Sequence, residues 1–309
     1  MAIDAITLTV GVATRNRPES LVRCLESIAL IADLVDEIIV IDDSSDPPID
    51  PALRRVSPTI QRMVRFIEQA GSQGPIVARN WMMRLAKNDC VLLLDDDAYV
   101  IDAEAVRRAV DVFQANPNVG AVACAQAEAD GSPWPAAMQP SPVEYVCYVA
   151  AYIGFAHLLR RSVFLALGGY QESFHFYGEE KDYCLRLLDA GYAVVYLPDA
   201  RVAHVPDASG RSESRYLRYV IRNDCLSAVY NEPLPMLLIT VPIRLARYIT
   251  MRRHGGASDP GGFRWIVGEL LASCPAVWRH RKPMRWASIR RWRKLRRAWP
   301  AFVSRPATS

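Results

Sequence analysis

The 309-residue sequence predicts an α/β fold in which helices flank a mostly parallel β-sheet, followed by a basic, helical C-terminal extension. Three observations support this prediction. Short β-rich runs alternate with helical patterns over the first two hundred residues, and this order is typical of a parallel sheet with crossover helices. Acidic clusters directly follow two of the apolar runs, and the chain becomes strongly basic from residue 244 onward.

The predicted strands are short runs of apolar and β-branched residues. They cover residues 6–13, 37–41, 63–67, 90–94, 119–125, 152–159 and 193–197. The helices between them show apolar residues at helical spacing, or a start signal such as Pro18 in a first turn. They are predicted from Asn16-Arg17-Pro18 onward, from residue 71 to about 86, and over residues 102–115, 161–167 and 178–190. The proline-rich residues 46–58 are predicted to be irregular.

The pattern changes twice in the second half of the chain. Residues 131–142 contain four prolines, which predicts a flexible loop over a site rather than a core element. Beyond residue 212 the pattern is mostly helical. We therefore divide the chain into residues 1–230, with halves at about 1–125 and 126–230, and a helical, Trp-rich extension over residues 231–309.

Composition excludes several classes of protein. With 51% hydrophobic and 23% charged residues, the chain is neither disordered nor fibrous. The most apolar segment, residues 234–243, is short and holds two prolines, so no membrane-spanning helix is expected. The first ten residues lack a basic region and are predicted to begin the first strand rather than a signal peptide. Seven scattered cysteines without a CxxC pair indicate reduced thiols and a cytoplasmic location.

Charge is unevenly distributed along the chain. Residues 1–243 carry 21 basic and 31 acidic side chains, whereas residues 244–309 carry 16 and 2, a net charge of +14. The basic part also contains Trp265, Trp278, Trp286, Trp292 and Trp299. Arginine and tryptophan on helices suit an anionic membrane surface. A solvated helical face or a polyanionic acceptor would explain the charge as well, and no nucleic-acid-binding motif is present.

The two acidic clusters point to a metal site. Asp42 and Asp43 follow one predicted strand, and the triplet Asp95-Asp96-Asp97 follows another. The carboxyl ends of strands in an open parallel sheet are where ligands bind. Clustered carboxylates repel one another unless a cation or a proton intervenes, and Mg²⁺ or Mn²⁺ shared with substrate phosphates would relieve that repulsion. A solvated acidic turn is the alternative.

Two further candidates come later in the chain. His204 stands between Ala203 and Val205, after a predicted strand and a Pro-Asp turn, and is either a hydrogen-bonded core residue or a ligand. Glu180 and Asp182 belong to an acidic run that opens a predicted helix, where acidic residues also interact favourably with the helix dipole alone. Being two positions apart, they cannot point the same way, so one could act as a general base while the other supports the fold.

Taken in order, six segments over roughly residues 5–230 resemble the inverting nucleotide-sugar glycosyltransferases of family 2, including the rhamnosyltransferases, which have the GT-A fold. The first segments are the strand and loop at residues 7–17, the DDxS element at 42–45 and the ARN segment that ends at Asn80. The others are the DxD motif at 95–97, the GGYQE…YGEEKDYCLR block at 168–186 and the segment from Gly191 to His204.

The resemblance implies a nucleoside-diphosphate donor (a UDP-, dTDP- or GDP-sugar), a bound Mn²⁺ or Mg²⁺, and a hydroxyl acceptor such as a saccharide, a lipid-linked glycan or a natural product. It implies donor contacts from Thr14, Arg15, Arg17, Asp42, Asp43, Gly74, Arg79, Asp95 and Asp96. It implies metal ligands at Asp95, Asp97 and His204. The family's catalytic base is usually the aspartate of an ED pair, and that position is Glu180 here, so we expect Glu180 to be the base and keep Asp182 as the alternative. Arg215 or Arg218 could also brace the diphosphate.

The sequence therefore predicts a metal-dependent inverting hexosyl- or deoxyhexosyltransferase of the cytoplasm, with peripheral binding to the inner face of the membrane through residues 244–309. Two other interpretations stay open. A GT-A-like, membrane-associated protein without catalytic activity would also account for the glutamate at position 180. A phosphatase with a DxD motif is the other, although that motif normally lies near the N-terminus.

Overall fold

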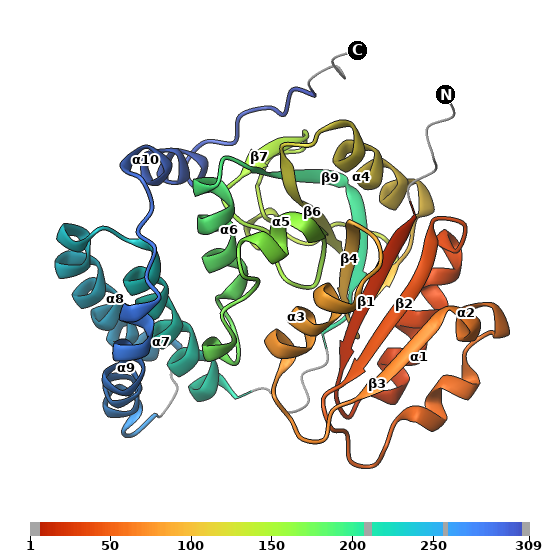
Figure 1. Cartoon of the computed structure of the whole chain (residues 1–309), viewed down its shortest axis with the longest axis horizontal. Coiled ribbons are helices and arrows are strands. Elements are labelled where there is room, and N and C mark those ends of the chain that lie inside the picture. Colours follow the sequence, from red (N-terminus) through yellow and green to blue (C-terminus); the bar gives the residue numbers. More distant parts are fainter. Residues whose placement is uncertain (1–6, 207–211, 256–258, 305–309) are drawn as a thin grey trace.

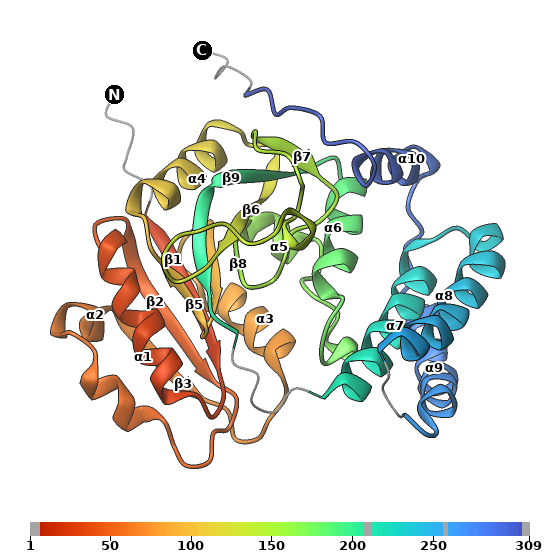
Figure 2. The same ribbon diagram turned by 180° about the vertical axis from the view of Figure 1, so that it is seen from behind.

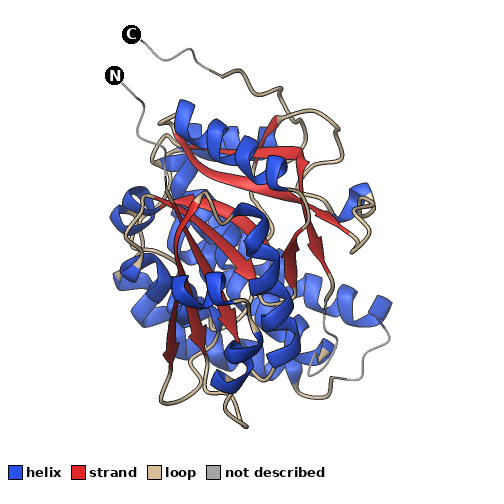
Figure 3. Cartoon of the chain, turned by 90° about the vertical axis from the view of Figure 1, so that its right-hand side faces the viewer, coloured by secondary structure: helices blue, strands red, loops and turns tan. Residues whose placement is uncertain are grey.

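The computed structural model describes residues 7–206, 212–255 and 259–304, and within them a nine-stranded sheet lies between layers of helices (Figures 1 and 3). The strand order is β3-β2-β1-β4-β8-β6-β9-β5, and β7 pairs with β9. The first four strands pair in parallel, as do β6 and β9, whereas β8, β5 and β7 run antiparallel to their neighbours. The predicted α/β class with a mostly parallel sheet is confirmed.

The strands are β1 Leu8–Thr14, β2 Val35–Asp42, β3 Val64–Glu68, β4 Cys90–Asp95, β5 Ala98–Val100, β6 Val119–Ala127, β7 Cys147–Val149, β8 Ala156–Arg160 and β9 Ala193–His204. The helices are α1 Pro18–Ser27, α2 Pro58–Met63, α3 Pro75–Leu85, α4 Ala103–Ala115, α5 Arg161–Ala166, α6 Glu179–Asp189, α7 Glu213–Asn231, α8 Leu234–Gly255, α9 Gly262–Arg279 and α10 Trp286–Leu295.

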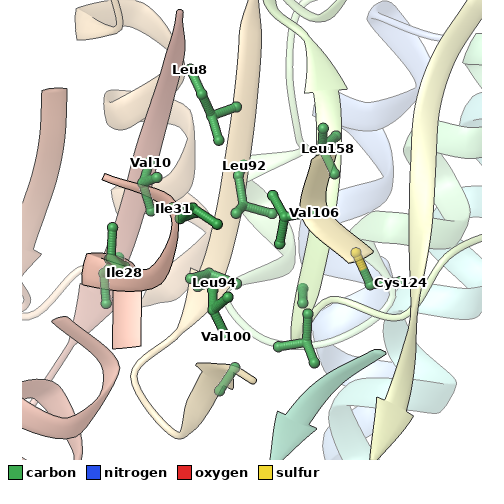
Figure 4. Close-up of a cluster of buried hydrophobic side chains, with 14 of the residues drawn as sticks. Leu8, Val10, Ile28, Ile31, Leu92, Leu94, Val100, Val106, Cys124 and Leu158 are labelled. Atoms are coloured by element: carbon green, nitrogen blue, oxygen red, sulfur yellow. The ribbon is translucent and has the colours of Figure 1, made fainter. Parts of the chain in front are cut away.

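Strand β4 shows how the sequence builds two cores on one sheet. Its side chains alternate between the two faces, as the period of a strand requires. Leu92 and Leu94 point into a core formed with α1 and α4, where they lie near Ile28 and Val106 (Figure 4). Val91 and Leu93 join the second core, which packs under α3, α5 and α6. Because β4 is apolar on both faces, it lies in the middle of the sheet and holds its terminal aspartate at the sheet edge.

The predicted strand at 152–159 begins later than expected, at Ala156, and two short strands, β5 and β7, were not predicted. The short helix α2 follows the irregular stretch, so the next strand starts at Val64. Three-residue strands carry too little apolar periodicity to be recognised, because pairing with β9 rather than local preference forms them.

Strand β9 is longer than predicted and changes the interpretation of His204. The Pro198-Asp199 pair does not end the strand; the register with β6 shifts between Cys124 and Ala125, whose partners are Leu197 and Arg201. Such an irregularity lets a strand pass a proline that cannot donate a ladder hydrogen bond. His204 is therefore the last residue of a strand and pairs with Ala98 of β5.

Helices α8 and α9 pack on α7 at the end of the molecule that lies away from β2 and β3 (Figures 1 and 2). Helix α8 continues through Pro242 to Gly255, so it extends well beyond the apolar segment 234–243 noted in the sequence. Its segment Leu234–Arg252 has a mean hydropathy of 1.3 and is 17% buried. By length and composition, this one helix of the described chain could cross a membrane, which corrects the expectation that the segment is too short.

Candidate active site

The two acidic clusters predicted from the sequence lie at the carboxyl ends of the neighbouring parallel strands β2 and β4, on either side of β1. Asp42 is the last residue of β2 and Asp95 the last of β4, and both strands pair with β1. In register, Thr14 lies opposite Asp42 and Ala13 opposite Asp95. The end of β1 therefore separates the two predicted acidic clusters by one strand.

Arg17 and Thr14 hold the middle of the triplet. Asp96 accepts hydrogen bonds from the Thr14 hydroxyl at 2.8 Å and from Arg17 at 3.0 Å, and Arg17 also reaches Asp97 at 3.3 Å. Burial raises the pKa of Asp96 to about 6, against the lowering effect of Arg17. These contacts fix the loop between β4 and β5 and leave the other Asp97 oxygen directed toward β9.

Asp97 faces His204. The distance between Asp97 Oδ1 and His204 Nε2 is 3.6 Å, and the backbone N–H of Val205 donates to the Asp97 carbonyl at 3.0 Å. The imidazole is stacked between two aromatic rings, with centroid distances of 5.2 Å to Trp134 and 5.0 Å to Phe155. The ring can therefore rotate little, and its Nε2 edge is held toward the carboxylate.

The hydrogen bonds of Gln126 define the tautomer of this histidine. The Gln126 side-chain nitrogen donates to the carbonyl of Met138, and a carbonyl oxygen can only accept. The Gln126 Oε1 atom therefore faces His204 Nδ1 at 2.7 Å, so Nδ1 carries a proton. When the ring is neutral, Nε2 carries the lone pair, and two electron-rich atoms, Nε2 and Asp97 Oδ1, face each other.

This arrangement fits a divalent cation with oxygen and nitrogen ligands. A cation between Asp97 and His204 would relieve the repulsion of the two facing atoms, and a histidine that donates its other N–H to a side-chain oxygen is a common metal ligand. Within the described residues, no group of three or more His, Cys, Asp or Glu side chains could hold a metal. The protein would therefore supply few ligands, as is usual for Mg²⁺ or Mn²⁺ bound together with phosphates.

The third predicted ligand, Asp95, is placed differently. Its Oδ1 atom accepts from Arg79 at 2.5 Å, and its side chain is 34% exposed. Arg79 is almost completely buried and also binds Glu179 at 2.7 Å and the Gly154 carbonyl at 3.3 Å. Burial lowers the pKa of Arg79, but the nearby carboxylates of Asp95 and Glu179 more than compensate and hold it above its ordinary value.

Glu180 lies near this arginine, whose charge lowers the pKa of the Glu180 carboxyl against the larger raising effect of burial. A Cβ atom on Gly154 would come within 2.2 Å of Glu180 Oε1 and 3.4 Å of Arg79 Nη2, so a side chain at position 154 would force this carboxylate to shift. Burial raises the pKa of Glu180, and burial together with Glu180 raises the pKa of Glu179 to about 8. A carboxylate whose pKa is raised is a better proton acceptor near neutral pH.

Asp182 is turned away from this group. Its carboxylate is fully buried and accepts hydrogen bonds from Arg186 at 3.0 Å, Ser227 at 2.9 Å and Asn231 at 2.6 Å. These partners belong to α6 and α7, so Asp182 joins the two helices. The structure brings Glu180, Arg79 and Asp95 together and leaves Asp182 outside this cluster.

Asp42 and Asp43 play different parts at the end of β2. Asp43 accepts from the Ser72 hydroxyl and from the backbone N–H groups of Gln73 and Gly74, so its carboxylate holds the loop before α3. Arg15 reaches the same loop, donating to Ser72 at 2.7 Å. Asp42 accepts from Ser45, and in the described chain its other buried oxygen has no hydrogen-bond partner. That oxygen is the one left to receive a donor from a ligand.

Asn80 connects α3 to the turn that precedes the catalytic candidates. Its side chain donates to the Tyr170 carbonyl and accepts from the Tyr170 N–H, both at 2.9 Å. A Cβ on Gly169, where φ is +69°, would lie 2.8 Å from Asn80 Oδ1. Both the left-handed backbone and the close approach require glycine there.

Glu179 and Gly154 were not predicted as site residues, although both line the Arg79 cluster. Glu179 belongs to the acidic run in the sequence, but it is not a predicted site residue because its neighbour Glu180 is the one that matches the family motif. Of the two arginines proposed from the sequence as diphosphate contacts, Arg218 binds Asp259 at 2.9 Å. Arg215 lies over the ring of Phe176, whose Cζ atom would be 3.9 Å from a Cβ on Gly74, so its contact with the diphosphate stays a prediction.

The mostly parallel sheet and the carboxylates at its strand ends are the features of a GT-A-type α/β protein with an acidic site at the sheet edge. The chain belongs to glycosyl transferase family 2, whose family model matches residues 9–174. The fold and family implied by the sequence motifs are therefore confirmed.

Two curated relatives match part of the chain. It is 26% identical to the O-antigen biosynthesis protein RfbC of Myxococcus xanthus over 212 residues, which cover 58% of this chain and 16% of the relative. It is 28% identical to the pre-mycofactocin glycosyltransferase of Mycobacterium tuberculosis over 209 residues, which cover 64% of this chain and 42% of the relative. The chain spans less than half the length of these curated relatives.

Solved structures with the same fold are GT-A-type glycosyltransferases. The mannosyltransferase PcManGT of Pyrobaculum calidifontis, in complex with GDP-Man and Mn²⁺, superposes with a TM-score of 0.59 at 19% identity, over 87% of this chain and 75% of that chain. GalNAc-T7 with UDP, GalNAc and Mn²⁺ gives a TM-score of 0.62 at 14% identity, over 89% of this chain and 58% of that chain. At these identities the likeness establishes the fold.

Proposed function

We propose that this protein is a metal-dependent, inverting glycosyltransferase that moves a hexosyl or deoxyhexosyl group from a nucleoside-diphosphate donor to a hydroxyl acceptor. The observation that carries the proposal is that candidate metal ligands and a candidate base lie together at the end of strand β4. Asp97 and His204 have two facing ligand atoms 3.6 Å apart. The Glu180 carboxylate lies close to Arg79, which pairs with Asp95, the last residue of β4.

Asp97 and His204 would hold Mn²⁺ or Mg²⁺. Asp95, the third ligand predicted from the sequence, is paired with Arg79 at 2.5 Å. The cation would neutralise charge on the departing nucleoside diphosphate. Gln126 keeps His204 in the tautomer whose Nε2 can bind, and Trp134 and Phe155 keep its ring in place. The relatives in structure, PcManGT and GalNAc-T7, were each solved with Mn²⁺, which supports the choice of a divalent ion.

The donor's nucleoside would lie along Thr14, Arg15, Arg17, Asp42, Asp43 and Gly74. The unpaired oxygen of Asp42 is the strongest support for this part, because a buried acceptor without a donor is costly unless a ligand supplies one. We propose a UDP-, dTDP- or GDP-linked sugar. Arg79 acts through the carboxylates it holds, and its predicted contact with the diphosphate stays a proposal.

Glu180 would act as the general base. It would accept the proton of the acceptor hydroxyl while the oxygen attacks the anomeric carbon from the face opposite the leaving diphosphate, so that configuration inverts. The charge of Arg79 favours the ionised form of this carboxyl, and Gly154 gives it room. Asp182 is the weaker candidate because its carboxylate already receives three hydrogen-bonding side chains.

The test is release of nucleoside diphosphate from a panel of UDP-, dTDP- and GDP-sugars with Mn²⁺, with Mg²⁺ and with EDTA. We expect release with one nucleotide class, dependence on the metal, and loss in Asp97→Asn. Nucleotide and Mn²⁺ binding without turnover against any hydroxyl acceptor would instead support a GT-A-like protein without activity. Phosphate release from a sugar phosphate, without nucleotide, would support the phosphatase.

A further inference from the structure

Helices α8 and α9 expose large apolar side chains to solvent. The most exposed are Leu238 at 81%, Leu271 at 72%, Ile239 at 64% and Ile243 at 62% of their surface. We call the set the α8–α9 face; it comprises Leu234, Leu238, Ile239, Ile243 and Ile249 of α8, and Phe263, Leu271 and Trp278 of α9. An apolar cluster of this kind usually marks an interaction surface.

Other side chains of the same two helices are already packed. In α8, Val241, Leu245 and Tyr248 lie against the second core, and in α9 Ile266, Leu270 and Val277 do so. Leu238, Ile239, Ile243 and Leu271, by contrast, each expose more than half of their surface. Packing within the described chain therefore does not explain these exposed apolar residues.

Exposed basic side chains lie on the same two helices as this apolar surface. Arg247 and Arg252 of α8 and Arg264 and Arg279 of α9 are exposed, and the Arg281 guanidinium lies 4.7 Å from the ring centre of Trp278. Residues 244–309 carry 16 basic but only 2 acidic side chains. A protein partner would have to match this charge with acidic groups, whereas an anionic lipid leaflet offers hydrocarbon and phosphate together.

The mid-helix contacts of α8 exclude the simplest spanning arrangement. Arg244, near the middle of the apolar segment, is largely buried and binds Glu232 at 2.7 Å and Asp224 at 3.3 Å. Further along, the Tyr248 hydroxyl donates to Asp259 at 2.7 Å. A helix that crossed the bilayer would break these bonds and place charged groups in hydrocarbon. The contacts hold α8 along the surface of the domain.

We propose that the α8–α9 face docks in the plane of an anionic lipid leaflet, with its leucine and isoleucine side chains in the acyl boundary and its arginines at the phosphates. Of the five tryptophans that the sequence suggested for the membrane surface, only two are exposed enough to reach lipid. Trp265, Trp292 and Trp299 pack against the protein, whereas Trp278 and Trp286 are about half exposed. Docking does not depend on sugar transfer.

The test is flotation of the purified full chain with phosphatidylcholine vesicles, with and without phosphatidylglycerol. We expect binding to the anionic vesicles, and a decrease of roughly tenfold or more in the bound fraction for Leu238→Glu and for Leu271→Glu. Leu30→Glu is the matched control, because Leu30 is 51% exposed on the other side of the sheet and its substitution should leave flotation unchanged. Equal melting temperatures would show that all variants fold.

Three results would overturn the proposal. Unchanged flotation of both α8–α9 variants would show that another surface binds. Resistance of the bound wild-type protein to alkaline carbonate would indicate a spanning helix. Dimerisation in sedimentation experiments that Leu238→Glu abolishes, without vesicle binding, would assign the face to a second copy. Nucleotide binding, measured in parallel, reports on the proposed function and is independent of these outcomes.

Discussion

At the scale of single residues, hydrogen bonds within the protein show which carboxylates are available to a substrate. The sequence predicts Glu180 as the base and Asp182 as the alternative. In the structure the Asp182 carboxylate accepts hydrogen bonds from Arg186, Ser227 and Asn231, while the Glu180 carboxylate lies against Gly154 and close to Arg79. A base must have a free lone pair for its substrate. The three side chains that bind Asp182 therefore make it the less available acid, which spacing in the sequence could not show.

Replacing Glu180 by glutamine should lower kcat by about 10²–10⁴ because the general base is lost. Glutamine has the same size and still fits beside Gly154, so affinity for the nucleoside diphosphate should change little. Steady-state kinetics and calorimetry measure the two effects separately. Asp182→Asn is the comparison: a decrease in melting temperature with most of kcat retained is expected, and the reverse pattern would move the base to Asp182.

The pH dependence should follow the raised pKa of Glu180. A base works only when ionised, so kcat/KM should fall as the pH decreases through this pKa, at a pH above the ordinary carboxyl value of 4.5. The residual activity of Glu180→Gln should lack this acidic limb. If the limb persists unchanged in that variant, another group such as Asp96, whose pKa is about 6, is responsible.

Gln126 should matter through the His204 tautomer. Gln126→Leu removes the acceptor for the Nδ1 proton, and outer-shell changes of this kind typically weaken metal affinity about 10–100-fold. Gln126→Glu keeps an oxygen opposite Nδ1 and should bind Mn²⁺ much better than the leucine variant. Mn²⁺ titration followed by electron paramagnetic resonance measures this without any turnover; equal affinities for the two variants would refute the role.

At the scale of elements, the site depends on contacts between segments far apart in the chain. Asp97 meets His204 only because β5 pairs with β9 and the irregularity near Pro198 extends β9 to residue 204. Asn80 in α3 holds the turn at Gly169 and Tyr170, from which the chain continues to Glu179 and Glu180. These contacts set the position of catalytic candidates that no single element determines.

Asn80→Ala should therefore lower the free energy of unfolding by about 1–3 kcal/mol, because it leaves the buried N–H and C=O groups of Tyr170 without partners. Arg84→Ala is the matched control on the same helix. Arg84 pairs with Glu172 at an exposed position, and such a pair contributes about 0–1 kcal/mol. Urea unfolding measures both; an equal effect of the two substitutions would contradict the account.

At the scale of the whole molecule, the sequence predicts the sheet better than the site's internal contacts. The apolar runs that became β1, β2, β4 and β6 are buried on both faces, and such strands are recognisable from composition alone. The acidic triplet was placed at a sheet edge for the same reason. The family motifs supplied His204 and Glu180.

Other features depend on tertiary packing and left no local signal. The burial of Arg79 between Asp95 and Glu179 links three segments of the chain. Gly154 looks like any loop glycine until its distance to Glu180 is known. The length of α8 was missed because proline at position 242 ordinarily ends a helix, whereas here packing on α7 continues it.

The central claim is that Asp97 and His204 hold a divalent cation together with a nucleoside diphosphate. Calorimetric titration of UDP, dTDP and GDP, each with and without Mn²⁺, tests this most directly when wild type is compared with Asp97→Asn. Asp130→Asn, a change of the same chemistry at an exposed loop position, is the control. The account predicts Mn²⁺-dependent binding of at least one nucleotide in the wild type and the control, and its loss in Asp97→Asn; equally tight, Mn²⁺-dependent binding in Asp97→Asn would contradict it.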